Sequence, residues 1–125
     1  IDNFGIVTDA QWADLNQDGR EDLIIVGEYS PVTIFINSKQ GFDRLNNDTL
    51  DKTMGLWRAL EVVDLDDDGD LDILLGNLGK NNMLSISPET PLVISTRDLD
   101  KNGSVDPLMF NSQRNKKGDW DMFLT

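Results

Sequence analysis

Acidic and amide side chains recur in this chain with one fixed spacing. Three nine-residue segments begin at Asp14, Asp64 and Asp98 and superimpose without gaps, each reading Asp-Leu-[Asp/Asn]-x-[Asp/Asn]-Gly-x-x-Asp. A hard divalent cation such as Ca²⁺ binds about six to eight oxygen atoms at about 2.3–2.6 Å. Side-chain oxygens at positions 1, 3, 5 and 9, with the backbone carbonyl at position 7, supply such a ligand set. Glycine at position 6 permits the sharp turn between them.

The spacing therefore predicts one calcium site in each segment, two to three Ca²⁺ ions in all. We call residues 14–22 loop one, residues 64–72 loop two and residues 98–106 loop three. The position-7 residue of each loop contributes only its carbonyl. The predicted metal ligands are Asp14, Asn16, Asp18, Arg20 and Asp22 in loop one, Asp64, Asp66, Asp68, Asp70 and Asp72 in loop two, and Asp98, Asp100, Asn102, Ser104 and Asp106 in loop three.

Two other interpretations of these loops need to be weighed. A solvated acidic turn explains any single loop, because Asp, Asn and Gly favour turns for local reasons. Three copies in register, each with Gly at position 6 and Asp at position 9, favour a metal site instead. An EF-hand also needs a bidentate Glu at position 12 and a helix on each side. Position 12 is Ile25, Leu75 and Met109 here, so the EF-hand interpretation fails. A dockerin-type loop is excluded in the same way, because it also needs an acid at position 12 followed by a helix.

The net charge of −12 restricts the partners of the chain. It opposes binding to nucleic-acid phosphates and to anionic membrane surfaces. The sequence contains no apolar run of about 18 residues, so we expect no membrane insertion. Three bound Ca²⁺ ions would reduce the formal charge from −12 to −6.

Cysteine and histidine are both absent, which excludes disulfides, thiolate nucleophiles, imidazole bases and Cys/His zinc sites. Catalysis by carboxylates remains possible, because a glycosidase needs only two carboxylates about 5–10 Å apart. However, 10 of the 23 acids are already predicted calcium ligands. Glu28 and Glu61 are the other acids nearest to predicted strands, and nothing in the sequence pairs them. We therefore expect a protein that is not an enzyme, with the propeller portion of a polysaccharide lyase or glycosidase as the alternative.

Short apolar runs rich in β-branched residues flank the loops and predict buried strands. Helical periodicity is nearly absent, and only residues 48–57 form a candidate helix. Asn37–Gly41 is a turn-forming segment, and the extended chain resumes at Phe42. We therefore predict a β-meander that carries three acidic loops, with strands at residues 23–27, 32–36, 60–63, 73–76 and 92–96.

The loops start 50 and then 34 residues apart, and such periods are typical of an array of repeated units. The loop followed by an apolar strand and Gly resembles the FG-GAP/VCBS repeats of the integrin-α-like β-propeller superfamily. The resemblance extends over essentially the whole chain to bacterial cartilage-acidic-protein-like (ASPIC/UnbV-associated) proteins. It is carried by the phrases at Val7–Asp14, Val26–Thr33, Gly55–Trp57, Gly76–Gly79 and Asp98–Pro107.

This resemblance implies an all-β fold of β-propeller blades, in which each loop joins the first two strands of a blade. A closed propeller needs at least four blades of about 40–50 residues. We expect residues 1–125 to be a single partial propeller of two to three blades, a fragment of a longer one, with approximate units at 5–57, 58–91 and 92–125. The 34-residue spacing is short for a four-stranded blade. Pro107 cannot donate to a ladder, so loop three is the least secure site.

The resemblance also implies a function and a location. It points to a secreted, cell-surface or periplasmic protein, a calcium-stabilised scaffold for adhesion that presents loops to a protein or glycan ligand. For Trp12, Trp57 and Trp120 we favour packing in the core or between blades over a sugar-stacking platform, and Trp57–Arg58 is the best candidate ligand contact. Exposed blade faces predict self-association through Phe4, Ile6 and Val7 at one end and Met122, Phe123 and Leu124 at the other.

Overall fold

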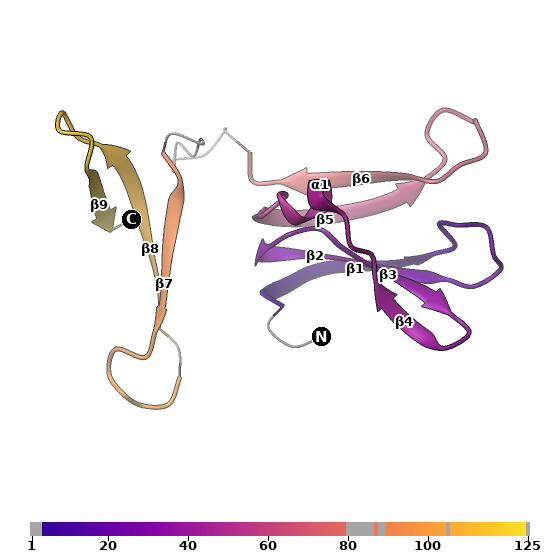
Figure 1. The fold of residues 1–125 in the computed structure, drawn as a ribbon, viewed down its shortest axis with the longest axis horizontal. Helices are drawn as coiled ribbons and strands as arrows, with labels where there is room; N and C mark the ends of the chain where they lie inside the picture. The colour runs from indigo at the N-terminus through magenta and orange to yellow at the C-terminus, as the bar shows by residue number, and fades with distance from the viewer. Residues whose placement is uncertain (1–3, 80–86, 88–89, 105, 125) are drawn as a thin grey trace. The chain divides into compact units, whose positions relative to one another are not determined.

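The computed structural model describes residues 4–79, 87, 90–104 and 106–124, and apart from one helical turn the regular elements of these residues are antiparallel strands (Figure 1). The chain divides into two compact units, unit 1 at Ile1–Leu78 and unit 2 at Gly79–Thr125. The prediction of an all-β fold of partial propeller blades is confirmed. The boundaries of the three approximate repeat units stay a prediction, and residues 80–86 and 88–89 of the second lie outside the described residues.

Unit 1 begins with a four-stranded meander. Strands β1 (Ile6–Ala13), β2 (Asp22–Ser30), β3 (Thr33–Ser38) and β4 (Gly41–Arg44) follow one another, and each pairs antiparallel with the next. This is the strand order of a propeller blade. Loop one joins β1 to β2, as the resemblance implies.

The meander continues through one helical turn into a hairpin. The side chain of Asn47 caps α1 (Asp48–Asp51) by accepting the amides of Thr49 and Leu50. Strand β5 (Gly55–Val63) then pairs with β6 (Asp72–Asn77), and loop two connects them. The candidate helix at residues 48–57 is thus limited to its first turn, because the chain is extended again from Gly55 onward.

Strand β2 is the centre of unit 1. It lies between β1 and β3, and its register also reaches β5 where Glu28 pairs with Leu56. A strand covered on both faces reads as a continuous apolar run, which is the pattern of residues 23–27. The buried core cluster combines this strand with its neighbours: Ile24, Val26, Val32, Ile34 and Leu60.

A bulge in β1 ties the first blade to β5. The register of β1 shifts between Val7 and Asp9, which frees Thr8 from the regular ladder. The Thr8 hydroxyl donates to the carbonyl of Trp57 at 2.8 Å. The Asp9 carboxylate accepts the amide of Leu60, a buried residue, at 2.9 Å.

Replacing Asp9 by Ala is expected to lower the free energy of unfolding by about 1–3 kcal/mol, because it leaves the buried Leu60 amide without its partner. Urea denaturation measures this loss. Asp43→Ala is a matched control, since within the described residues the polar contact of that carboxylate is a long one, 3.5 Å to the Ser38 hydroxyl. Equal midpoints for the two variants would show that the Asp9 bond contributes nothing.

Unit 2 is a three-stranded meander of β7 (Leu92–Arg97), β8 (Asp106–Arg114) and β9 (Trp120–Leu124), and loop three joins β7 to β8. Pro107 does not prevent this pairing, and it lies opposite Thr96 in the register. Strand β9 pairs only with residues 110–114 of β8, so in the described structure Pro107 has a neighbouring strand on one side. Proline is tolerated at such a position.

Candidate metal centre

The three loops share one set of internal hydrogen bonds. In each, the position-1 carboxylate accepts the amides of positions 5 and 6, the position-9 carboxylate accepts the amide of position 2, and the position-5 side chain accepts the amide of position 7. In loop two the amides of Asp68, Gly69, Leu65 and Asp70 donate in this way at 3.2, 2.9, 3.0 and 2.9 Å. The same bonds form in loops one and three at 2.7–3.1 Å. The spacing of the repeat therefore fixes a conformation as well as a composition.

Two positions in each loop require a left-handed backbone. Glycine occupies position 6, with φ of 84°, 93° and 90° at Gly19, Gly69 and Gly103. Position 4 has φ between 57° and 62° in all three loops, although its residues carry side chains. A Cβ at position 6 would be strained in this region even though nothing lies near it. The glycine therefore serves the turn, as the sequence predicts.

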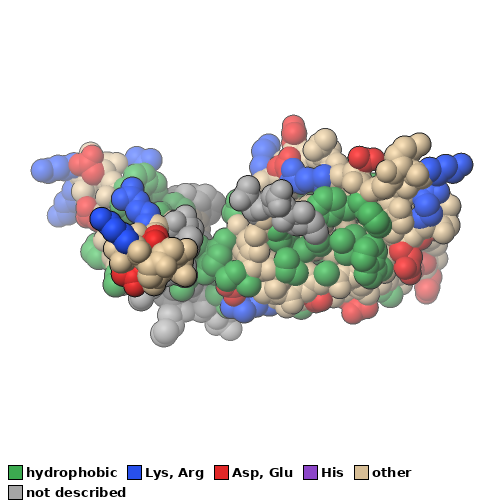
Figure 2. Space-filling view, turned by 90° about the horizontal axis from the view of Figure 1, so that it is seen from below, with side chains coloured by type: hydrophobic (Ala, Val, Ile, Leu, Met, Phe, Trp, Pro, Cys, Tyr) green, Lys and Arg blue, Asp and Glu red, His purple; other side chains and the backbone are tan. Residues whose placement is uncertain are grey.

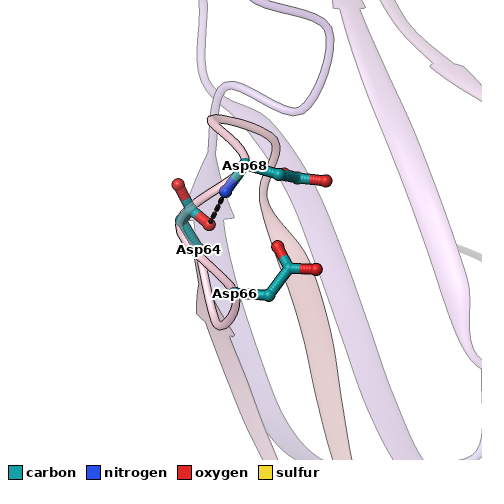
Figure 3. A group of neighbouring side chains, drawn as sticks. All are labelled: Asp64, Asp66 and Asp68. Carbon is teal, nitrogen blue, oxygen red and sulfur yellow. Dashed lines mark hydrogen bonds between the residues drawn. The ribbon is translucent and has the colours of Figure 1, made fainter.

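Loop two brings the carboxylates of Asp64, Asp66 and Asp68 close to one another (Figure 3). One carboxylate oxygen from each of Asp64, Asp66 and Asp68 lies within 4.8 Å of the other two. Two ligands that each bind an ion at about 2.4 Å lie at most about 4.8 Å apart. The donor set of loop two thus fits a hard cation.

Loop three brings together three carboxylates at the same spacing, those of Asp98, Asp100 and Asp106. Its fourth side-chain candidate, Asn102, accepts the amide of Ser104 at 2.8 Å. The loop that the sequence marks as least secure therefore also has a donor set that fits a cation.

Loop one has the same backbone but a different distribution of carboxylates. Among the described residues, the groups of three carboxylates at this spacing lie in loops two and three only. The Asp18 carboxylate forms an ion pair with Arg20. Asp22 is fully buried, and its two oxygens accept the amides of Leu15 and Asn37 at 3.1 and 2.8 Å. The predicted loop-one ligands are thus present but partly engaged by their own chain.

Asn37 supports loop one, a role that the sequence does not predict. Besides its bond to Asp22, its side chain donates to the carbonyl of Glu21 at 3.0 Å. Its own carbonyl accepts the Arg20 Nε at 2.7 Å. Nothing in the linear pattern marks this role, because only the pairing of β2 with β3 brings Asn37 to loop one.

Loops one and two are neighbours at the same end of unit 1 (Figure 1). The side chain of Gln17, at position 4 of loop one, donates to the carbonyl of Gly69 at 3.2 Å and to the carboxylate of Asp70 at 3.0 Å. The two candidate sites therefore touch through an exposed hydrogen-bond pair.

The tryptophans differ in their surroundings. Trp57 packs on the core cluster and donates its indole N–H to the carbonyl of Thr53 at 2.8 Å, in line with the packing prediction. Trp12 is 52% exposed and makes an edge-to-face contact with Phe42, with ring centroids 5.7 Å apart. Trp120 is also exposed and lies beneath the Arg114 guanidinium. Trp12 and Trp120 are thus surface residues of their units.

The Arg58 side chain, the other half of the candidate ligand contact, pairs with Glu28 at 2.5 Å. The sequence alone does not indicate a partner for Glu28. Partial burial, and then the negative charge of Glu28, raise the pKa of the adjacent Tyr29 phenol above its ordinary value. Arg58 itself remains more than half exposed.

Comparison with known proteins identifies the repeat. Residues 14–75, from the start of loop one to strand β6, match the model of the FG-GAP-like repeat family. The resemblance to FG-GAP repeat proteins is therefore confirmed, and the finer resemblance to cartilage-acidic-protein-like proteins stays a prediction. No curated protein and no solved structure matched the chain. Within the described residues, no helix is long and apolar enough to cross a membrane.

Proposed function

We propose that this FG-GAP repeat protein is a calcium-binding β-propeller repeat module, a non-catalytic scaffold that presents its surface to a protein or glycan ligand. The observation that carries the proposal is the gathering of three carboxylates in loop two, repeated in loop three. The hydrogen bonds described above hold the side chains of positions 1, 5 and 9 in place, and like charges lie close together where a cation would relieve their repulsion.

The residues that would hold the ion follow from the loop positions. In loop two they are the carboxylates of positions 1, 3, 5 and 9 and the carbonyl of Asp70. In loop three they are the equivalent carboxylates, the Asn102 side chain and the carbonyl of Ser104. A bound Ca²⁺ would neutralise charge and cross-link the ends of two strands, β5 and β6 or β7 and β8.

The chemistry of the donors favours calcium over other metals. All of the candidate ligands are oxygen atoms, and the chain has no Cys or His to bind a softer metal. Magnesium demands a tighter octahedron and retains its waters. Extracellular calcium modules bind with dissociation constants of about 10⁻⁴–10⁻³ M. The location that we propose, at the cell surface, in the periplasm or outside the cell, would place these loops among such modules.

Calorimetric titration of the chelator-treated protein with CaCl₂ tests the proposal. We expect a saturable heat with a stoichiometry of two to three ions per chain. A titration with no saturable heat up to about 10 mM calcium, beyond the weakest sites of such modules, would exclude the proposed function.

The non-catalytic part of the proposal has its own test. The protein, incubated with a panel of polysaccharides, is expected to bind one or none of them and to release no products. Release of oligosaccharides would favour the alternative of a carbohydrate-active enzyme with a propeller body.

Self-association is the remaining proposal about partners. Hydrophobic side chains gather on the face of unit 1 that is seen in Figure 2. Of the six residues predicted to mediate self-association, Phe4 is partly buried. The other five are at least half exposed: Ile6, Val7, Met122, Phe123 and Leu124. Light scattering is expected to show association that grows with Ca²⁺, because bound ions reduce the net charge that keeps chains apart. A monomer at millimolar protein and saturating Ca²⁺ would contradict this expectation.

A further inference from the structure

We propose that the guanidinium of Arg20 acts as a built-in cation of loop one, which keeps the Asp18 carboxylate occupied and makes loop one the weakest of the three calcium sites. The inference rests on the proposed calcium binding and assigns a role to a side chain that the ligand pattern leaves unused. Position 7 needs to supply only its carbonyl, so its side chain is free to act on the rest of the loop.

Position 7 distinguishes the three loops. It is Arg20 in loop one, Asp70 in loop two and Ser104 in loop three, so only loop one carries a positive charge there. One oxygen of the Asp18 carboxylate pairs with the Arg20 guanidinium, and the other accepts the Arg20 amide at 3.0 Å. A single residue therefore engages both oxygens of the predicted position-5 ligand.

The guanidinium is also anchored on its other side. Its Nε donates to the carbonyl of Asn37, at the end of strand β3, at 2.7 Å. The cation is thus held between Asp18 and the neighbouring strand by two contacts. A side chain fixed in this way occupies the loop more persistently than a freely rotating surface Arg would.

Other contacts tie loop one to the rest of unit 1. Asp22, at position 9, is fully buried and bonds the amide of Asn37. Leu15, at position 2, packs against the core, whereas Leu65 and Leu99 at the same position are 66% and 54% exposed. Loop one is therefore built into the blade by contacts that loops two and three lack among the described residues.

A calcium ion that binds loop one has to displace the Arg20 guanidinium from the Asp18 carboxylate or share that carboxylate with it. The ion pair is partly exposed, with side chains 35% and 27% accessible, so its loss has a modest cost. Repulsion between the guanidinium and a divalent ion adds to that cost. Removing the positive charge should therefore tighten calcium binding at loop one by roughly twofold to fivefold, on the scale of a partly exposed ion pair.

The three position-6 glycines provide one reporter for each loop. Each of their amides donates to a position-1 carboxylate, so its NMR resonance should move when that loop takes up an ion. In a titration of the ¹⁵N-labelled chain with CaCl₂, the Gly69 and Gly103 amides are expected to shift at lower calcium than the Gly19 amide. In Arg20→Gln, the calcium midpoint of the Gly19 amide should fall by roughly twofold to fivefold, while the midpoints of Gly69 and Gly103 stay unchanged.

Two further variants make the test decisive. Arg44→Gln removes a guanidinium that pairs with Asp51 of α1, and it should leave all three midpoints as they are. Arg20→Ser copies the position-7 residue of loop three and replaces Arg20→Gln if that variant does not fold. Equal Gly19 midpoints in the wild type and the Arg20 variants, with Gly69 and Gly103 still responding, would overturn the role of Arg20 but leave calcium binding intact. If none of the three amides responds, calcium binding itself is absent.

Discussion

Calcium at about 2 mM is expected to raise the melting temperature of this chain by roughly 10–18 °C, and magnesium by clearly less. An ion that binds only the folded state stabilises it by RT ln(1 + [L]/Kd). With Kd of about 10⁻⁴ M this is about 1.8 kcal/mol per site, and two such sites give about 3.6 kcal/mol. Each kcal/mol corresponds to about 3–5 °C for a chain of this size. The effect is large because loops two and three hold converging carboxylates that nothing else neutralises in the described structure.

Salt screening has to be separated from specific binding in this experiment. Monovalent salt also weakens repulsion between carboxylates, so the control is NaCl at the same ionic strength, which should give a much smaller increase. Addition of a chelator should return the melting temperature to its starting value. A melting curve that is the same with calcium and after thorough chelation would rule out a stabilising calcium site.

Asp68→Ala is expected to remove the tightest step of the calcium titration and to weaken that site at least about tenfold, since ligand charge sets affinity in such loops. Loop two places carboxylates at positions 1, 3, 5 and 9, whereas loops one and three each have one Asn and three carboxylates. Asp68 is one of the three grouped carboxylates of loop two, so its removal takes away a central ligand.

The neighbouring Asp67 offers a matched control. It lies at position 4, outside the predicted ligand set, with a φ of 59° that Asn tolerates as well as Asp does. Asp67→Asn removes one charge from the same loop and should leave the tightest step nearly unchanged. If Asp18→Ala or Asp100→Ala removes that step instead, the ranking of the loops is wrong.

The local features of the candidate site could be predicted from the sequence because they depend on spacing alone. The bonds from Gly69 and Asp68 to Asp64 join residues four and five apart, so the nine-residue pattern determines them. Strand β2 was equally predictable, since its unbroken apolar run is what burial on both faces requires. The helix at residues 48–57 was overestimated because Asn47 provides a cap for one turn and nothing extends it.

Some contacts that distinguish the loops could not be predicted, because they join segments that are distant in the sequence. Asn37 reaches loop one through the β2–β3 register, and Gln17 reaches loop two across more than fifty residues of sequence. Arg20 was counted only for its carbonyl, since a repeat pattern does not show where a side chain points. The ion pair between Glu28 and Arg58 also joins distant segments, so the sequence alone does not predict it.

A crystal structure of the chain grown in saturating calcium tests the central claim most directly. The account predicts an ion in loop two and another in loop three, each held by about six to eight oxygen atoms at about 2.3–2.6 Å. The protein ligands in loop two should be the side chains of Asp64, Asp66, Asp68 and Asp72 and the carbonyl of Asp70. Electron density that shows loop two without an ion under these conditions, or calcium held by other residues, would contradict the account.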